Sequence, residues 1–417
     1  MSQFNRLFDR KAGNARKWAD QVLAEKFGLT ANAIPMDLAD FDFPVAPPIH
    51  QAIMTRAAVP DYSYTYIPEA FYETVIAWNA RRFGLQLEKD WIKLSYGTVP
   101  TLHYLVQAFT EQNEAVLINT PAYDPFAEAV RNNHRQLATS PLMLVDNRYE
   151  FDFADMAAKM QRPDVKMFIL CSPQNPSGRV WTAEELARVG ELCRQHQVLL
   201  ISDEIHRDIV YPGVTFTSIW QACPAIQSQS ILCLSPNKAF NLGGLKTSYV
   251  VIPDPAIRAR LNAQFVANSI TSPNSFAVPA LIAAYTDCDA WLDEMVAYVA
   301  ANFAYLVNRL QVIPEIQVMP SDSGFLAWLD TQRLFPDETA MKRFFTAADL
   351  SCVVGSYFVA DGGGFGLCTI AAIVDLHGLR WGHHDIHTAA GQRADIAFTL
   401  AIMQQQRVQM LRADRFL

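Results

Sequence analysis

Charge is scarce in this sequence, and it forms no basic run. Only 18% of the 417 residues are charged, against about 25% in an average soluble protein. A large buried or oligomeric surface would account for this deficit. The formal net charge is −8, which disfavours nucleic acid and anionic membranes as main binding partners. We therefore expect neither a nucleic-acid partner nor a membrane partner.

Targeting and membrane-spanning patterns are missing as well. Residues 1–18 lack the apolar core of a secretory signal. No uninterrupted apolar stretch reaches about 18 residues, and the nearest one, 364–379, is broken by Asp375 and His377. The cysteines are scattered without a CxxC pair, at positions 171, 193, 223, 233, 288, 352 and 368. Free thiols are typical of a reducing compartment, so we expect a cytoplasmic protein without a metal site.

Short apolar runs alternate with helical patterns between residues 100 and 252. The runs are bounded by Pro, Asp or Ser and are typical of buried strands; they cover 114–121, 166–173, 198–204, 230–235 and 247–252. A helix is predicted after Thr182, which stands three residues before Glu185 as in a capping box. A second helix is predicted around Pro100, which suits a first helical turn. This alternation predicts an α/β fold, a three-layer sandwich around a mostly parallel mixed sheet.

The two ends of the chain differ from its middle. Residues 1–46 contain one helical pattern and a proline-rich exit, and 291–417 contain long helical segments and a strand-like run. We predict that these two ranges form a smaller α+β domain together, and that 47–290 form the large domain.

Polar side chains follow three of the predicted strands. Asn175 follows the strand at 166–171, Asp203 and His206 follow the strand at 198–202, and Ser235 and Lys238 follow the strand at 230–234. Ligands of open parallel sheets bind outside the carboxyl ends of the strands, so these side chains are expected to converge.

One further loop supplies an anion site to the same place. The stretch "SYGTVPT", 95–101, precedes a helix and offers backbone N–H groups at its N-terminus. An amine, a carboxylate, an amide and an anion cradle together suit pyridoxal 5′-phosphate, because a lysine forms a Schiff base with its aldehyde and a carboxylate keeps its ring nitrogen protonated.

Each of these residues also has an ordinary structural interpretation. Alone, Lys238 is a surface lysine, Asp203 an acid at the end of a strand and His206 a structural histidine. "GTVP" alone is the start of a helix, and Asn175 between two prolines shapes a turn. Their joint spacing favours the cofactor site.

The motifs resemble those of a known family. They are similar to the fold-type I, pyridoxal-phosphate-dependent enzymes of the class I/II aminotransferase group, and within it to the cystathionine β-lyase (C–S lyase) branch. The resemblance runs from about residue 35 to 330. It rests on "MDLADFDFPVAPP" (36–48), "YSYTY" (62–66), "PAYDPF" (121–126), "CSPQNPSGRVWT" (171–182), "ISDEIHRDIV" (201–210) and "SPNKAFNLGGLK" (235–246).

The resemblance implies a role for each site residue. Lys238 would bind the cofactor aldehyde and move the Cα proton of the substrate, and Asp203 would pair with the ring nitrogen. Asn175 would bond the ring hydroxyl with His206 beside it. Tyr123 would stack on the ring, and Tyr64 would reach the phosphate of the neighbouring subunit, which implies a homodimer. The remaining residues would hold the phosphate: Gly97, Thr98, Val99, Ser235 and Lys246. Packing in aromatic loops is the alternative for Tyr64 and Tyr123.

Three positions depart from the family pattern. Asn237 precedes the lysine where the family has Ser or Thr, and Lys246 stands where aminotransferases commonly have arginine. Leu367 occupies the place of the arginine that binds the substrate carboxylate. We hypothesise that "LCTIAAIVDLHG", 367–378, is an insertion and that Arg380, with Asn175, binds the substrate; the alternative is that the arginine is lost and Arg380 lies on the surface.

The resemblance favours one activity and leaves two alternatives. A C–S β-lyase would convert cystathionine or a cysteine-type amino acid into pyruvate, ammonia and a thiol. An aminotransferase would use the same residues with a keto acid as acceptor. The alternative of another class is a cofactor-binding regulatory partner of another protein, without significant turnover.

Overall fold

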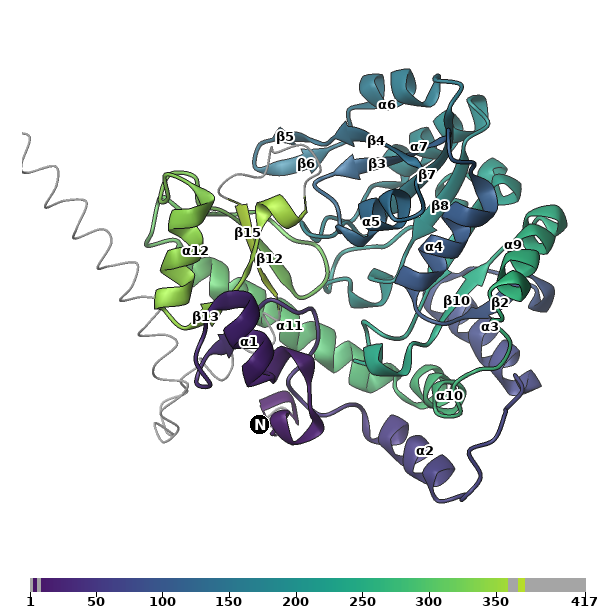
Figure 1. Ribbon diagram of the computed structural model, residues 1–417, viewed down its shortest axis with the longest axis horizontal. Helices are drawn as coiled ribbons and strands as arrows, with labels where there is room; N and C mark the ends of the chain where they lie inside the picture. Colours follow the sequence, from purple (N-terminus) through teal and green to yellow (C-terminus); the bar gives the residue numbers. More distant parts are fainter. Residues whose placement is uncertain (1–2, 6–8, 359–366, 372–417) are drawn as a thin grey trace, which may run out of the picture.

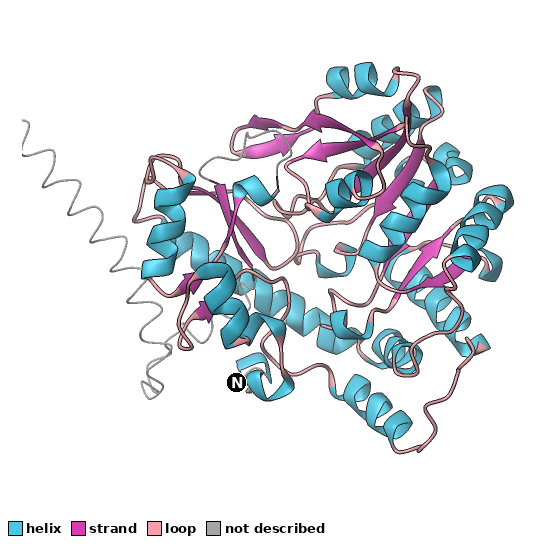
Figure 2. Cartoon of the chain, viewed as in Figure 1, coloured by secondary structure: helices cyan, strands magenta, loops and turns pink. Residues whose placement is uncertain are grey.

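A seven-stranded mixed sheet forms the centre of the protein (Figures 1 and 2). The computed structural model describes residues 3–5, 9–358 and 367–371. The strands in spatial order are β2 (Ile92–Ser95), β10 (Ser248–Val251), β9 (Ser230–Leu234), β8 (Leu199–Asp203), β7 (Val165–Cys171), β3 (Ala115–Thr120) and β4 (Gln136–Pro141). The five strands from β9 to β4 are parallel, whereas β10 runs antiparallel to both β9 and β2.

Helices cover both faces of this sheet, because its central strands are apolar on both sides. Val116 and Met167 face one way and pack with α4 (Thr98–Phe109), α5 (Pro125–Arg131) and α9 (Pro255–Ala267). Leu117 and Phe168 face the other way. The helices on that second side are α3 (Glu69–Phe83), α6 (Phe153–Met160), α7 (Ala183–Gln195) and α10 (Ala277–Asp287). The predicted three-layer α/β sandwich is confirmed.

The sequence also predicted local features of this part correctly. All five apolar runs are strands, and their ends differ from the expected ones by at most a few residues. Thr182 caps α7 by accepting a hydrogen bond from the backbone N–H of Glu185, whose side chain accepts one from the N–H of Thr182. Pro100 lies in the first turn of α4.

A second, four-stranded sheet lies beside the large one. Its order is β11 (Gln317–Val318), β12 (Leu326–Asp330), β15 (Leu367–Ala371) and β14 (Val353–Val354). The long helix α11 (Asp289–Leu310) runs between the two parts, and α12 (Glu338–Ala347) lies on the outer side (Figure 1). The remaining elements are α1 (Asp20–Phe27), α2 (Pro47–Ala57), α8 (Ile219–Ala222), and the strands β1 (Ile34–Pro35), β5 (Met143–Val145), β6 (Arg148–Glu150) and β13 (Leu350–Ser351).

The N-terminal segment joins the second part of the chain through a parallel pair of strands. Ile34 of β1 pairs with Leu350 of β13, and Pro35 pairs with Ser351. Such a pairing is what a small domain built from both ends of the chain requires. The limits 1–46, 291–417 and 47–290 stay a prediction.

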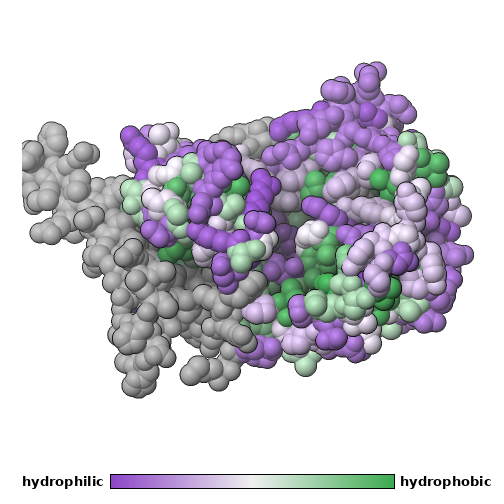
Figure 3. Space-filling model, turned by 60° about the horizontal axis from the view of Figure 1, so that its bottom comes forward, coloured by the Kyte–Doolittle hydropathy of each residue, from purple (hydrophilic) through white to green (hydrophobic). Residues whose placement is uncertain are grey.

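The connection from α2 to α3 projects from the body of the molecule (Figure 1). It exposes large side chains, among them Val59, Tyr62, Tyr64 and Tyr66. Hydrophobic patches appear among hydrophilic residues on the underside of the molecule (Figure 3). Within the described ranges, no helix is both long and apolar enough to cross a membrane.

Candidate active site

Several of the predicted site residues lie at or just after the carboxyl ends of β7, β8 and β9. Cys171 at the end of β7 pairs with Asp203 at the end of β8, which in turn pairs with Cys233 of β9. Ser235 and Lys238 follow directly after β9. Asp203 is 3% exposed, so this edge of the sheet presents a carboxylate that is almost out of contact with water.

Burial controls the charge of Asp203. It raises the pKa of the carboxyl from 3.8 to about 7, although a hydrogen bond from the Ile205 N–H and the charge of Lys238 act in the opposite direction. The Ile205 nitrogen lies 3.2 Å from Oδ1 of Asp203. A carboxylate deprived of water in this way gains strongly from any cation placed against it.

Lys238 reaches the same region from the loop after β9. Burial lowers the pKa of its amine, and the charges of Asp40 and Asp203 partly restore it. The Nζ atom donates a hydrogen bond to the backbone oxygen of Ala39 at 3.2 Å. An amine with a lowered pKa is a better nucleophile at neutral pH, which is what bond formation with an aldehyde requires.

His206 and Tyr123 line the surroundings of Asp203. Burial first, and the charge of Lys238 second, lower the pKa of His206 to about 3, so its ring is neutral at pH 7. Burial, followed by the charges of Tyr357 and Asp203, raises the pKa of Tyr123, so its hydroxyl stays protonated. These residues therefore offer neutral hydrogen-bonding groups and an aromatic ring.

Asn175 has an unpaired polar atom close to the end of β7. The residue is 7% exposed, and its Oδ1 has no hydrogen-bond partner among the described residues. Its backbone N–H donates to Sγ of Cys171 at 3.3 Å, which places it beside the end of β7. Buried polar groups are normally paired, so this amide is suited to bind an external group.

An anion cradle begins where α4 starts. Gly97 has φ +98°, and a Cβ atom added to it would lie 3.6 Å from Cδ of Lys246. Thr98 and Val99 open α4, whose N-terminal N–H groups favour an anion. Glycine permits this backbone conformation and leaves space between the helix and Lys246.

Ser235 lies next to this cradle but is already bonded. Its hydroxyl donates to the backbone oxygen of Thr247 at 2.6 Å and accepts from the Asn237 N–H at 3.0 Å. The buried atoms Oγ1 of Thr247 and Oδ1 of Asn237 have no partner in the part of the chain that is described. Two unpaired polar atoms therefore lie near Ser235, and neither was expected from the sequence.

One predicted site residue does not join this group, and another lies outside the described residues. Tyr64 is 95% exposed on the projecting connection between α2 and α3. Arg380 lies outside the described residues, so its role stays a prediction. Residues 367–371 of the supposed insertion form β15, which pairs with β12 on one side and β14 on the other. These five residues are therefore part of the second sheet, and the insertion of 367–378 relative to the family stays a prediction.

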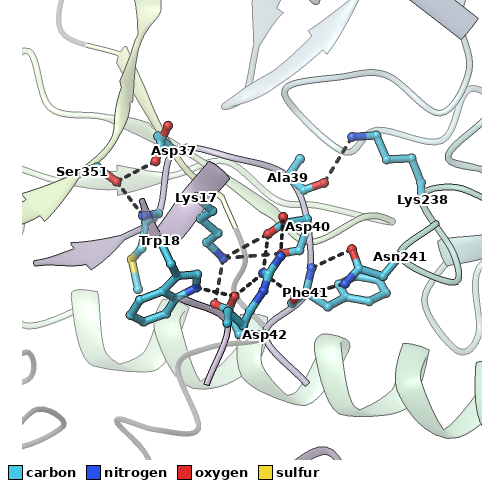
Figure 4. Close-up of polar contacts among 12 residues, drawn as sticks. Lys17, Trp18, Asp37, Ala39, Asp40, Phe41, Asp42, Lys238, Asn241 and Ser351 are labelled. Atoms are coloured by element: carbon cyan, nitrogen blue, oxygen red, sulfur yellow. Dashed lines mark hydrogen bonds and ion pairs between the residues drawn. The ribbon is translucent and has the colours of Figure 1, made fainter. Parts of the chain in front are cut away.

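The sequence interpretation missed the residues that face Lys238 from the N-terminal segment (Figure 4). Ala39 supplies the carbonyl that accepts from Nζ, and the flanking Asp40 and Asp42 are ion-paired with Arg10 and Lys17. The alternation of aspartate and phenylalanine in "ADFDF", 39–43, was a visible signal, because acidic residues between buried aromatics need buried cations.

The residues present suit pyridoxal 5′-phosphate. The test is the pattern of unpaired groups: a buried amide oxygen at Asn175 without a partner, a buried carboxyl at Asp203 that needs a cation, and a glycine-bearing helix start at Gly97 that favours an anion. A cationic ring nitrogen, a ring hydroxyl and a phosphate satisfy these three needs.

Known proteins resemble the chain over nearly its full length. Residues 24–367 match the family described as aminotransferase class I and II. The chain is 34% identical to cystathionine beta-lyase PatB of Bacillus subtilis, over 90% of this chain and 98% of that protein. It is 29% identical to protein MalY of Escherichia coli, over 88% and 93% of the two chains.

Two solved structures have the same fold as this chain. Cystalysin of Treponema denticola, whose crystal structure contains pyridoxal 5′-phosphate, superposes with a TM-score of 0.87 at 26% identity, over 96% of this chain and 99% of the other. The C–S lyase of Staphylococcus hominis does so with a TM-score of 0.85 at 28% identity, over 97% and 99%. The chain belongs to the aminotransferase class I and II family.

Proposed function

We propose that the protein is a pyridoxal-phosphate-dependent C–S β-lyase that acts on cystathionine or a related cysteine-type amino acid. The observation that carries this proposal is the likeness to the cystathionine β-lyase PatB, which extends over 98% of that relative. The likeness to the solved C–S lyase supports it. The site adds a buried carboxyl, a lysine of lowered pKa and an anion cradle in one place.

Each residue of the site has its own role in the proposed reaction. The cofactor, when bound, withdraws electrons from the substrate Cα through its protonated ring. Asp203 would hold the positive charge on the ring nitrogen, Asn175 would bond the ring hydroxyl, and the start of α4 with Lys246 would hold the phosphate. Lys238 would hold the cofactor at its aldehyde group, and its free amine would take the proton from Cα of the substrate. With water as the second reactant, the substrate would lose its β-thiol group, and the products would be pyruvate, ammonia and the free thiol.

A single assay separates this activity from its nearest alternative. The purified protein, loaded with pyridoxal 5′-phosphate, is incubated with cystathionine and no keto acid, and pyruvate and thiol are measured. Equal amounts of both products are expected. A strict requirement for a keto acid would identify an aminotransferase, the second candidate, after which the matching family is named. Cofactor binding without either turnover would favour the regulatory alternative.

Assembly into a homodimer belongs to the same proposal. Tyr62, Tyr64 and Tyr66 are 62%, 95% and 81% exposed on one short connection, and clustered exposed aromatic residues mark interaction surfaces. We infer that this connection crosses to a second copy and that the Tyr64 hydroxyl reaches the phosphate bound there. Light scattering should give twice the mass of one chain.

The substrate carboxylate needs a cation, and we propose Arg380 for it. The arginine fork binds a carboxylate through two hydrogen bonds. Arg380→Ala should raise KM for amino-acid substrates by about 10-fold or more, while the cofactor absorbance stays unchanged. An unchanged KM would show that Arg380 does not bind the substrate.

A further inference from the structure

A buried charge cluster of the N-terminal segment lies next to the loop that faces Lys238 (Figure 4). We call it the N-terminal clamp, and it consists of Arg10, Lys17, Trp18, Asp40 and Asp42. The Lys17 side chain is fully buried and that of Asp42 is 4% exposed. With two cations and two carboxylates, the clamp is neutral as a whole.

The contacts within the clamp are dense and directional. Arg10 donates to both carboxylate oxygens of Asp40 at 2.8 Å, and it also pairs with Asp42. Lys17 Nζ lies 2.8 Å from Oδ2 of Asp42, whose Oδ1 accepts from Trp18 Nε1 at 2.8 Å. Burial alone would lower the pKa of Arg10, but its bonds and ion pairs with Asp40 and Asp42 outweigh burial and raise it. Every charge of the clamp is thus met by an opposite charge.

The clamp also holds the backbone between its two aspartates. Arg10 Nη1 donates to the Phe41 oxygen at 2.6 Å. From the other side, Asn241 Nδ2 donates to this oxygen at 3.1 Å, and its Oδ1 accepts from the Phe41 N–H at 3.3 Å. The segment 39–42 is therefore fixed between the N-terminal segment and the loop that carries Lys238, three residues before Asn241.

The first residue of this fixed segment, Ala39, carries the carbonyl oxygen that accepts a hydrogen bond from the Lys238 amine. The Ala39 carbonyl precedes Asp40 directly and accepts from Lys238 Nζ at 3.2 Å. An ammonium group has three donors and no acceptor, so its position follows the acceptors around it. A carbonyl held by a rigid backbone defines that position better than a flexible side chain would.

We propose that the N-terminal clamp is a positioning device for the amine of Lys238. It holds the Ala39 carbonyl where the free amine rests between attachment to the cofactor aldehyde and transfer of the Cα proton. Arg10, Lys17, Asp40 and Asp42 are positioning residues in this account, and none of them touches the reacting atoms. The inference rests on the proposed function of Lys238 and adds residues to it that lie about 200 positions away in the sequence.

The experiment compares Arg10→Met with the control Arg82→Met. Arg82 also joins distant segments, since it pairs with Asp289 and Asp293 of α11 at 3.6 and 2.7 Å, but it belongs to α3. Two rates are measured: the attachment of added pyridoxal 5′-phosphate to Lys238, trapped with borohydride, and the exchange of the Cα proton of L-alanine in D₂O. Thermal melting reports the stability of each variant.

The clamp should affect both rates specifically. A misplacement of about 1 Å costs up to ~100-fold in rate, so Arg10→Met should slow both reactions about 10- to 100-fold, with a KM for L-alanine within about threefold. Arg10→Lys keeps the charge but loses the two-point bond to Asp40, and it should lie between Arg10→Met and wild type. Arg82→Met should keep both rates, even with a similar loss of melting temperature.

Four results would overturn the inference. Wild-type rates in folded Arg10→Met would show that the clamp does not position the amine, and so would equal losses in Arg82→Met. If Arg10→Met does not fold, Arg10→Lys and Asp40→Asn take its place. Wild-type rates of cofactor attachment and proton exchange in both of them would contradict the inference. A wild-type protein that forms no reducible adduct at Lys238 would refute the proposed function itself, and the inference with it.

Discussion

Replacing Asp203 by asparagine removes the charge that the proposed chemistry needs most. Burial raises the pKa of this carboxyl from 3.8 to about 7, and a difference of about 3 units corresponds to about 4 kcal/mol. A cation that restores the pKa of Asp203 to its ordinary value of 3.8 must supply free energy of this size. The ring nitrogen of the cofactor would receive the same stabilisation of its proton.

Asp203→Asn keeps the shape of the side chain and removes its charge. We expect kcat for pyruvate formation to fall on the order of 10²- to 10³-fold, as it does when a preorganised electrostatic partner is removed. The assay couples pyruvate to NADH oxidation by lactate dehydrogenase, at saturating cystathionine and with cofactor content measured for each sample.

The neighbouring Glu204 provides a matched control. It is also fully buried, but it accepts from Ser218 Oγ at 2.9 Å and faces Arg207 at 3.5 Å, so its charge belongs to the structure. Glu204→Gln should lower the melting temperature and leave kcat of the folded protein within about threefold. A kcat in Asp203→Asn close to that of wild type, with the cofactor bound, would refute the electron-withdrawing role of this site.

Three further predictions concern other residues of the site. Lys238→Ala should abolish the visible absorbance that borohydride removes, and a pyridoxyl group found elsewhere after reduction would contradict the assignment. Burial lowers the pKa of His206 to about 3 from 6.5, so between these pH values the unfolded chain binds a proton at this residue and the native protein does not. As pH falls from 6.5 to 5, the free energy of unfolding of wild type should therefore drop by about 2 kcal/mol relative to that of His206→Asn. The same pH dependence of unfolding in both proteins would argue against this burial. Tyr64→Ala should weaken cofactor retention about 10-fold in a dimer of unchanged mass, whereas unchanged retention would place Tyr64 outside the neighbouring site.

The fold was predictable because its signals are local. Strand β8 is a continuous apolar run that ends in Asp203, and α7 begins with a capping box at Thr182. A parallel sheet buried on both faces needs such runs, and its geometry places their carboxyl ends together. For this reason the sequence alone predicted that Asn175, Asp203 and Lys238 lie close together.

The clamp could not be predicted in this way, because its signal is not local. Arg10 and Asp40 are ordinary charged residues in sequence, and only the folded chain shows that a guanidinium with a 10% exposed side chain holds this carboxylate. A buried ion pair contributes little net stability once its desolvation is counted, so stability alone gives no reason to place four charges beside Lys238. The need for a fixed hydrogen-bond acceptor, the Ala39 carbonyl, is a reason to place these charges there. The same reasoning explains why the two aspartates of "ADFDF" alternate with phenylalanines: the phenylalanines keep water out, and without water the charges hold the backbone in a single position.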